Sequence, residues 1–147
     1  MSHLIFRYRY DESFFDHRQT RDDFGRLTLS VVTDSFSGTG GFWVQWQDVR
    51  RFGDRLSRFP ITSDEPVAEN WGGTIDDVYC LALGVEIAPA NKTGDLRVKV
   101  EIADEADPER RVCTWFLTNY PDLDAFRRSI ANLMDRKVDE AILRGRG

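Results

Sequence analysis

The chain has few of the residues that metal sites and disulfide frameworks require. It contains two cysteines and two histidines in 147 residues, with no HExxH, CxxC or His-x-His spacing. Two cysteines are too few for a disulfide scaffold, and Cys80 and Cys113 both fall within expected strands, so we interpret them as buried thiols. We therefore expect no metal and no cofactor.

Motifs of nucleophilic catalysis and phosphate binding are also missing. There is no Gly-x-Ser-x-Gly elbow, and the glycine-rich segment Ser37 to Gly41 lacks the Gly-Lys-Ser/Thr ending of a phosphate loop, which favours a hairpin turn. His17 beside Asp16 is the one base candidate, and a surface histidine next to a carboxylate is common. These absences indicate no catalytic residues and favour a protein that is not an enzyme.

Long apolar runs are absent as well. The first ten residues alternate between polar and apolar side chains without the apolar core of a secretion signal, and no run is long enough to span a bilayer. The 20 basic and 25 acidic residues give a net charge of −5, which opposes general binding to a phosphate backbone. We expect a cytoplasmic protein without a membrane or nucleic-acid partner.

What the chain does contain is enough apolar material for one core. Hydrophobic residues make up 41% of the sequence and aromatic residues 12%, a proportion that a disordered chain would lack. A chain of 147 residues has the size of one typical domain. We therefore expect residues 1–147 to form a single globular domain.

Alternating apolar residues predict about six strands. In the fourth strand, one face is assigned Tyr79, Leu81, Leu83, Val85 and Ile87, and in the fifth, charged residues alternate with apolar ones and predict one solvent-exposed face. The six strands cover Leu4 to Tyr10, Leu27 to Val32, Phe42 to Trp46, Val78 to Ile87, Leu96 to Ile102 and Val112 to Leu117.

Two segments without clear periodicity are interpreted as loops. The first, Asp11 to Gly25, is charged and interrupted. The second, Thr62 to Thr74, contains one proline and two glycines, but we expect Trp71 within it to fold back onto the core.

Two helices follow from apolar spacings of three and four. Asp48 is placed as the N-cap of a short helix that ends before Pro60, and Pro121 opens a long C-terminal helix. The apolar face of the second helix is assigned Leu123, Phe126, Ile130, Leu133, Met134 and Ala141. The order βββα-βββα predicts an α+β fold, with one largely antiparallel sheet and both helices on one face.

The two expected helices share one spacing pattern. Asp48-Val49-x-x-Phe52-x-x-x-Leu56 and Asp122-Leu123-x-x-Phe126-x-x-x-Ile130 lie 74 residues apart, and each follows an aromatic strand. A duplicated half would give this echo, and so would the generic pattern of any helix that packs on a sheet. Both interpretations stay open.

These two helices and the strands at Leu96 to Ile102 and Trp115-Phe116 resemble small bacterial domains of uncharacterised function. Some of those domains are similar to immunity proteins, which neutralise polymorphic toxins. The likeness covers roughly residues 26–135. Because the shared motifs are structural, the resemblance implies an α+β fold more than a function.

One surface candidate is a stripe of arginines on the first helix. Arg51, Arg55 and Arg58 fall within about 60° of one another, if successive residues are about 100° apart. This stripe could bind an acidic partner, while the alternative is that the aliphatic stems cover the edge of the core. The absence of catalytic motifs, the acidic net charge and the resemblance lead us to expect a non-enzymatic protein-interaction module, of which an immunity-type inhibitor is one form. It would meet a charged partner through its acidic loops or through the arginine stripe.

The rival hypothesis is a small-ligand binding domain or an unrecognised enzyme. Its pocket would lie between the sheet and the segment Thr62 to Thr74, with Trp71, Tyr79 and Arg97 in its lining. A third alternative is a homodimer formed by pairing of edge strands.

Overall fold

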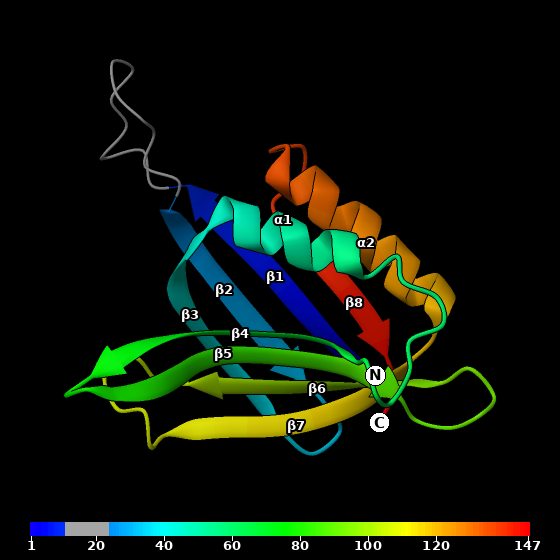
Figure 1. The fold of residues 1–147 in the computed structure, drawn as a ribbon, viewed down its shortest axis with the longest axis horizontal. Coiled ribbons are helices and arrows are strands. Elements are labelled where there is room, and N and C mark those ends of the chain that lie inside the picture. Colours follow the sequence, from blue (N-terminus) through cyan, green and yellow to red (C-terminus); the bar gives the residue numbers. More distant parts are fainter. Residues whose placement is uncertain (11–23) are drawn as a thin grey trace.

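The computed structural model describes residues 1–10 and 24–147, in which eight strands form two antiparallel sheets beside two helices (Figure 1). Sheet A has the order β3-β2-β1-β8, with β1 (Ser2–Tyr10), β2 (Phe24–Val32), β3 (Ser37–Gln45) and β8 (Ala141–Gly145). Sheet B has the order β4-β5-β6-β7, with β4 (Val67–Ile75), β5 (Val78–Pro89), β6 (Leu96–Ala103) and β7 (Arg111–Thr118).

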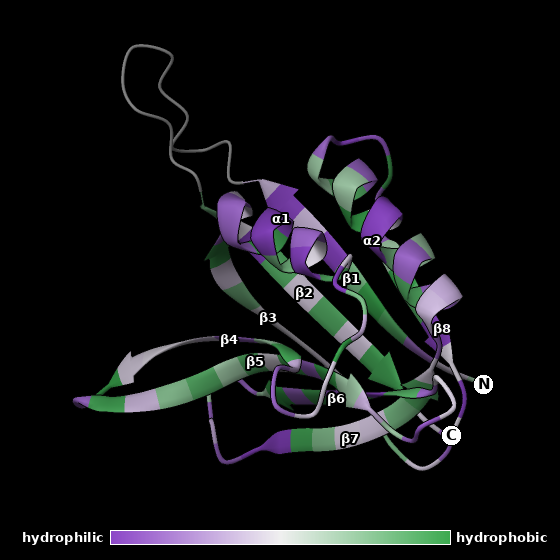
Figure 2. Cartoon of the chain, turned by 45° about the vertical axis from the view of Figure 1, so that its right-hand side comes forward, coloured by the Kyte–Doolittle hydropathy of each residue, from purple (hydrophilic) through white to green (hydrophobic). Residues whose placement is uncertain are grey.

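The helices α1 (Trp46–Arg55) and α2 (Tyr120–Met134) lie side by side on one face of sheet A (Figure 1). Asn119 is the N-cap of α2, where its side chain accepts a hydrogen bond of 2.8 Å from the backbone N–H of Asp122. Both helices turn their polar residues outward, while green apolar residues line the faces that meet the strands (Figure 2).

Four aromatic rings at the centre of the core join both sheets and both helices. The ring of Phe6 in β1 lies 5.7 Å from that of Phe52 in α1 and 5.3 Å from that of Phe126 in α2. Trp71 of β4 completes the group at 6.3 Å from Phe6. Apart from Ala103, the buried apolar residues of both sheets and both helices belong to one hydrophobic cluster.

Outside this aromatic centre, two contacts between strands also join the sheets. Leu117 of β7 exchanges two backbone hydrogen bonds, of 2.8 and 2.9 Å, with Arg146, directly after β8. At the other side of sheet A, β3 packs on β6 and β7 through glycines. A Cβ on Gly40 would lie 2.5 Å from Cγ2 of Ile102, so the glycine is what lets this strand approach sheet B closely.

The α+β fold with antiparallel sheets and two helices is confirmed, whereas the single six-stranded sheet in βββα-βββα order is wrong. The observed order is βββα-ββββ-α-β over the described residues. One reason is that Thr62 to Thr74 is not a loop, because β4 begins at Val67. Its proline precedes the strand, and Gly72 lies in the strand where the ring of Tyr79 covers it. Trp71 does fold onto the core, as expected.

Two further strand assignments change. The segment Ser37 to Gly41 is not the hairpin turn but the first half of β3, and the turn lies at residues 33–36. The C-terminal helix ends at Met134, and Ala141, expected on its apolar face, begins β8 and pairs with Phe6. A strand of five residues is too short for its alternation to stand out against a helical pattern.

A β-bulge splits the face assigned to the fourth expected strand. Trp71 pairs with Leu83, and the next residue of β4 pairs with Leu81, so Ala82 has no partner. Leu81 therefore turns to the outer face of sheet B, where its Cδ2 would lie 3.4 Å from a Cβ on Gly84. Tyr79 and Leu81 do not share the face of Leu83, Val85 and Ile87.

Three local assignments are also resolved. Cys80 and Cys113 lie in β5 and β7 as expected and are both free, but Cys80 is only half-buried and Cys113 is exposed, so they are not buried thiols. Asp48 lies in the first turn of α1, whose N-cap position is Gln45. Of the expected loop Asp11 to Gly25, residues 11–23 lie outside the described residues, and Gly25 belongs to β2.

Candidate functional site

Charge is distributed very unevenly between the two sheets. The four strands of sheet A contain no aspartate or glutamate, and they hold four of the 20 basic residues of the chain. The remaining 16 basic residues are outnumbered by all 25 acidic residues. A chain with a net charge of −5 thus contains a sheet whose side chains carry only positive charge.

The positive charges lie on the outer face of sheet A, which we call the basic face. Strand alternation sends most apolar residues of β1 and β2 to the buried face and their polar neighbours to the opposite one, where Ile5 and Val32 also lie. Cross-strand register then places Arg9 beside Arg26 and His3 beside Arg144. The prominent members of the basic face are His3, Arg7, Arg9, Arg26, Trp43 and Arg144.

Two arginines of this face are compensated and two are not. Arg7 pairs with Glu140 at 2.8 Å, and Arg26 pairs with Glu105. Arg9 and Arg144 are exposed, and within the described ranges neither side chain has an ion pair. The basic face therefore carries uncompensated positive charge at two places, on the exposed ends of long flexible side chains.

Arg26 links the basic face to a cavity at the edge of sheet A. Its guanidinium lies 5.8 Å from the ring centroid of Trp43 and crosses Gly41, on which a Cβ would lie 2.9 Å from Nε. From there it reaches Glu105 in the turn between β6 and β7. The glycine is needed for this crossing because any side chain would occupy the path of the guanidinium.

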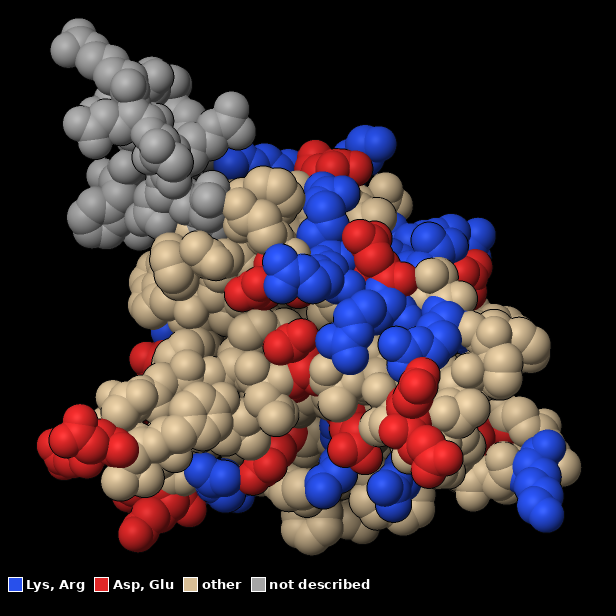
Figure 3. All heavy atoms as spheres, in the orientation of Figure 1, with Lys and Arg blue, Asp and Glu red and all other residues tan. Residues whose placement is uncertain are grey.

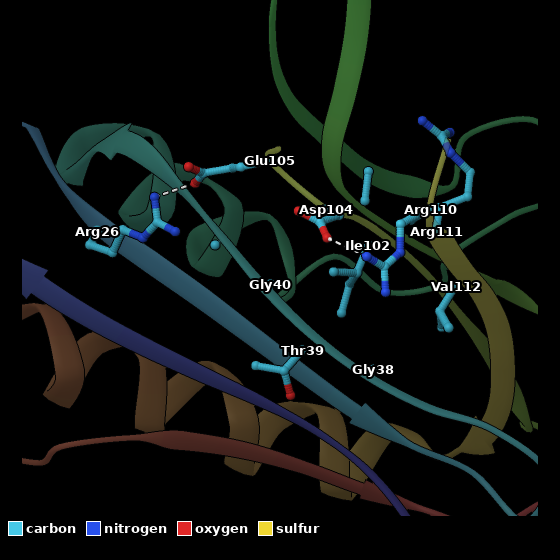
Figure 4. Close-up of a pocket in the computed structure, with 12 residues that line it drawn as sticks. Arg26, Gly38, Thr39, Gly40, Ile102, Asp104, Glu105, Arg110, Arg111 and Val112 are labelled. Atoms are coloured by element: carbon cyan, nitrogen blue, oxygen red, sulfur yellow. Dashed lines mark hydrogen bonds and ion pairs between the residues drawn. The ribbon is translucent and has the colours of Figure 1, made fainter. Parts of the chain in front are cut away.

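The cavity lies between β3 and the β6–β7 hairpin and has a volume of about 450 Å³ (Figure 4). Gly38 to Gly40 pass along one side, and Asp104, Arg110, Arg111 and Val112 stand on the other. Arg110 is 3.9 Å from Asp104, whereas Arg111 forms a closer pair with Glu101 at 2.7 Å.

The predicted arginine stripe on α1 is a different surface, on the face shown in Figure 3. Blue and red spheres interleave there over the helices. Arg51 pairs with Asp48 at 3.3 Å, Arg55 with Glu69 at 3.3 Å, and Arg58 donates to the backbone carbonyl of Glu65 at 3.0 Å. Arg55 also donates to the carbonyl of Ala68 at 2.9 Å. Arg58 lies beyond α1, which ends at Arg55, so the three arginines do not form one helical stripe. Arg55 and Arg58 thus hold the C-terminal end of α1 against β4 and the segment before it.

The residues of the rival pocket are not brought together. Trp71 is buried in the core, Tyr79 is exposed near the β4–β5 turn, and Arg97 lies on the outer face of β6, 4.0 Å from Glu86. Another cavity, of about 230 Å³, does touch Gly73 and Thr74 of the segment Thr62 to Thr74. Phe42 and Ala82 also line it, and none of the three expected residues does.

Other candidate chemistry finds no support in the part of the chain that is described. His17 and Asp16 lie outside the described residues, and among those described no three His, Cys, Asp or Glu side chains form a metal-binding group. No described helix has the length and apolar content to cross a membrane.

The groups whose pKa values are shifted lie away from the basic face. Burial raises the pKa of Tyr10, which Arg136 partly opposes, and the pKa of Asp135 is lowered by a hydrogen bond from Arg50. A hydrogen bond from Asn91 lowers the pKa of Asp95. These shifts arise from local contacts at the periphery of the fold.

The basic face was not predicted from the sequence because two of the sequence patterns that form it look ordinary when each is taken alone. Arg7 and Arg9 alternate with apolar residues, as in any strand with one solvent-exposed face. The expected C-terminal helix extends to Ala141, an interpretation that hides the position of Arg144 next to His3. The absence of acidic residues from all four strands was the available signal.

Comparison with protein-family models, curated proteins and solved structures finds no match to this chain.

Proposed function

We propose that the protein is a non-enzymatic interaction module that binds an acidic protein through the basic face of sheet A. The observation that carries this proposal is a four-stranded sheet without a single carboxylate side chain in a chain of net charge −5. Uncompensated arginines at Arg9 and Arg144 are available to pair with carboxylates of a partner. Complementary charge of this kind accelerates association and orients the partner.

A protein partner suits the charge distribution better than a nucleic acid does. The positive region is confined to one sheet, and the rest of the chain carries nine more acidic than basic residues. A long polyanion that extended beyond the sheet would meet this negative surface within a few Debye lengths of about 8 Å. A compact acidic protein surface that covers only sheet A would not meet this negative surface.

The more specific form of the proposal is an immunity-type inhibitor. It is supported by the resemblance of the helix and strand motifs to small bacterial domains, some similar to immunity proteins. In this form, the partner is a toxin domain with an acidic surface, and its activity is blocked by occupation of that surface.

The test is a capture experiment from extracts of the source organism with three baits. The wild-type protein and an Arg51→Glu/Arg58→Glu variant of the helix face should both retain one stoichiometric acidic protein, whereas an Arg9→Glu/Arg144→Glu variant should lose it. Loss with the helix variant instead would assign binding to the arginine stripe. Capture that disappears after nuclease treatment would contradict a protein partner.

The inhibitor form has its own test. The captured protein, expressed alone, should slow growth, and co-expression of the wild-type chain should restore it. Co-expression of the Arg9→Glu/Arg144→Glu variant should not. Unaffected growth with the partner alone would rule out the inhibitor form while leaving the interaction intact.

A further inference from the structure

The strand β3 is an edge strand with a free side. It pairs with β2 along residues 37–45, and among the described residues no backbone group of residues 37–43 has a hydrogen-bond partner outside β2. An antiparallel edge strand directs the N–H and C=O groups of every second residue away from its neighbour. The free side of β3 thus offers a row of unpaired donors and acceptors.

The free side of β3 opens into the cavity described above. The edge consists here of Gly38, Thr39, Gly40 and Gly41, so there are almost no side chains to cover it. The opposite wall is the β6–β7 hairpin (Figure 4). The apolar side chains of Ile102 and Val112 belong to this wall and lie against Gly40 and Gly38. The cavity is therefore a groove along an exposed backbone rather than a hole between side chains.

A second cavity continues the groove along β3. It has a volume of about 230 Å³ and shares Ala103, Asp104 and Glu105 with the first. Phe42 lines it from β3, and Ala82 and Cys80 line it from β5. A segment that runs along β3 from Gly38 would meet an open polar groove first and a mainly apolar pocket beside Phe42 next.

The charges at the groove favour an acidic residue in the bound segment. Of its cations, Arg111 is already bound to Glu101, and Arg26 to Glu105. Arg110 is the most exposed, and its nearest carboxylate, on Asp104, is 3.9 Å away, beyond hydrogen-bond length. The guanidinium of Arg110 can therefore donate hydrogen bonds to a carboxylate of a ligand without breaking a short ion pair.

We propose that the groove binds an extended peptide segment of a partner protein, which adds to β3 as a fifth strand of sheet A. The segment carries an acidic residue opposite Arg110 and an apolar residue that enters the pocket beside Phe42. Backbone hydrogen bonds to β3 supply affinity, and the two side-chain sites supply specificity. This inference rests on the proposed function only in taking the partner to be a protein.

The probe is a synthetic peptide, acetyl-Thr-Glu-Val-Thr-Val-Thr-Leu-amide, followed by its effect on backbone amide NMR signals. At about 1 mM peptide, a concentration that detects weak binding, the signals of Gly38 to Phe42 should shift. Two further peptides carry N-methyl groups, one on the odd-numbered and the other on the even-numbered residues of the peptide. Only every second amide of an added strand faces β3, so one of these two peptides should no longer cause the shifts and the other should still cause them.

Side-chain recognition is tested in the protein. Arg110→Glu should weaken binding by about tenfold, and Arg128→Glu, the same substitution at another exposed arginine on α2, should leave it unchanged. Replacement of the peptide leucine by alanine should weaken binding as well. Circular dichroism of both variants verifies that they are folded.

Three results would overturn the inference. They are no shift of the Gly38 to Phe42 signals with the unmodified peptide, loss of binding by both N-methylated peptides, or unchanged binding by both of them. Failure of this inference is distinguishable from failure of the proposed function, since Arg9→Glu/Arg144→Glu changes the basic face and not the groove. That variant should bind the peptide as the wild type does.

Discussion

Arg26 of β2 and Glu105 of the β6–β7 turn form an ion pair across the edge strand β3, over Gly41. The pair fastens sheet A to sheet B on the side opposite the Leu117–Arg146 backbone bridge. Both side chains are more than one-third exposed, so the ion pair itself contributes little to stability. Its role in the fold is to fix the position of a guanidinium that belongs to both the basic face and the groove.

Gly41→Ala should displace Arg26 and lower the free energy of unfolding by about 1–3 kcal/mol, because the added Cβ lies 2.9 Å from Nε of Arg26 and 3.0 Å from the carbonyl oxygen of Leu27. Denaturant unfolding measures the change. In an Arg26→Ala background the same substitution should cost less. An equal cost in both backgrounds would show that the Leu27 carbonyl, and not Arg26, sets the requirement for glycine.

Trp71→Ala should lower the free energy of unfolding by about 3–5 kcal/mol, since it removes one of the four rings that join both sheets and both helices. Trp71→Phe should cost less, because Nε1 of Trp71 is buried and has no hydrogen-bond partner within the described ranges. The control is Trp115→Ala on the exposed face of β7, which should change stability little. A larger loss at Trp115 than at Trp71 would contradict the placement of the core.

Arg50→Gln should raise the pKa of Asp135 toward its ordinary value of 3.8, because the Arg50 guanidinium donates a hydrogen bond of 2.8 Å to this carboxylate. A carboxyl group whose pKa is lower in the folded state stabilises the fold above its unfolded-state pKa. The stabilisation is lost as the pH falls below 3.8 through the folded-state value. NMR titration of the Asp135 carboxyl carbon in both proteins measures the shift, and an unchanged midpoint would contradict the assignment.

Cys113 should react with a thiol-specific reagent faster than Cys80, since Cys113 is exposed on β7 and Cys80 is half-buried in β5. Single Cys113→Ser and Cys80→Ser variants assign the two phases of the labelling reaction. Slow labelling of Cys113 in the native protein would indicate that the outer face of sheet B is covered in solution.

The parts of the fold that were predictable have simple periodicity. The strand over residues 96–102 alternates without interruption, because one face packs on the core and the other meets water. The helix at Leu123 to Met134 shows its buried stripe for the same reason. In both elements, burial of one face is decided by the element's own residues.

The parts that were missed depend on partners distant in sequence. The strand β4 contains Gly72 and Gly73, which look like loop residues until Tyr79 is placed over the first of them. The bulge at Ala82 reverses the facing of the residues before it, and no local pattern marks it. The basic face needed strands from both ends of the chain to be placed side by side.

The central position of β1 has a consequence for biosynthesis. This first strand pairs with β2 on one side and with β8, the last of the described elements, on the other. During translation, β1 keeps an open hydrogen-bonding edge until β8 leaves the ribosome, because pairing between such distant segments cannot begin earlier. A growing chain of this topology exposes that edge to intermolecular strand pairing while the residues between β1 and β8 are synthesised, which makes a holdase chaperone or rapid elongation valuable to its yield.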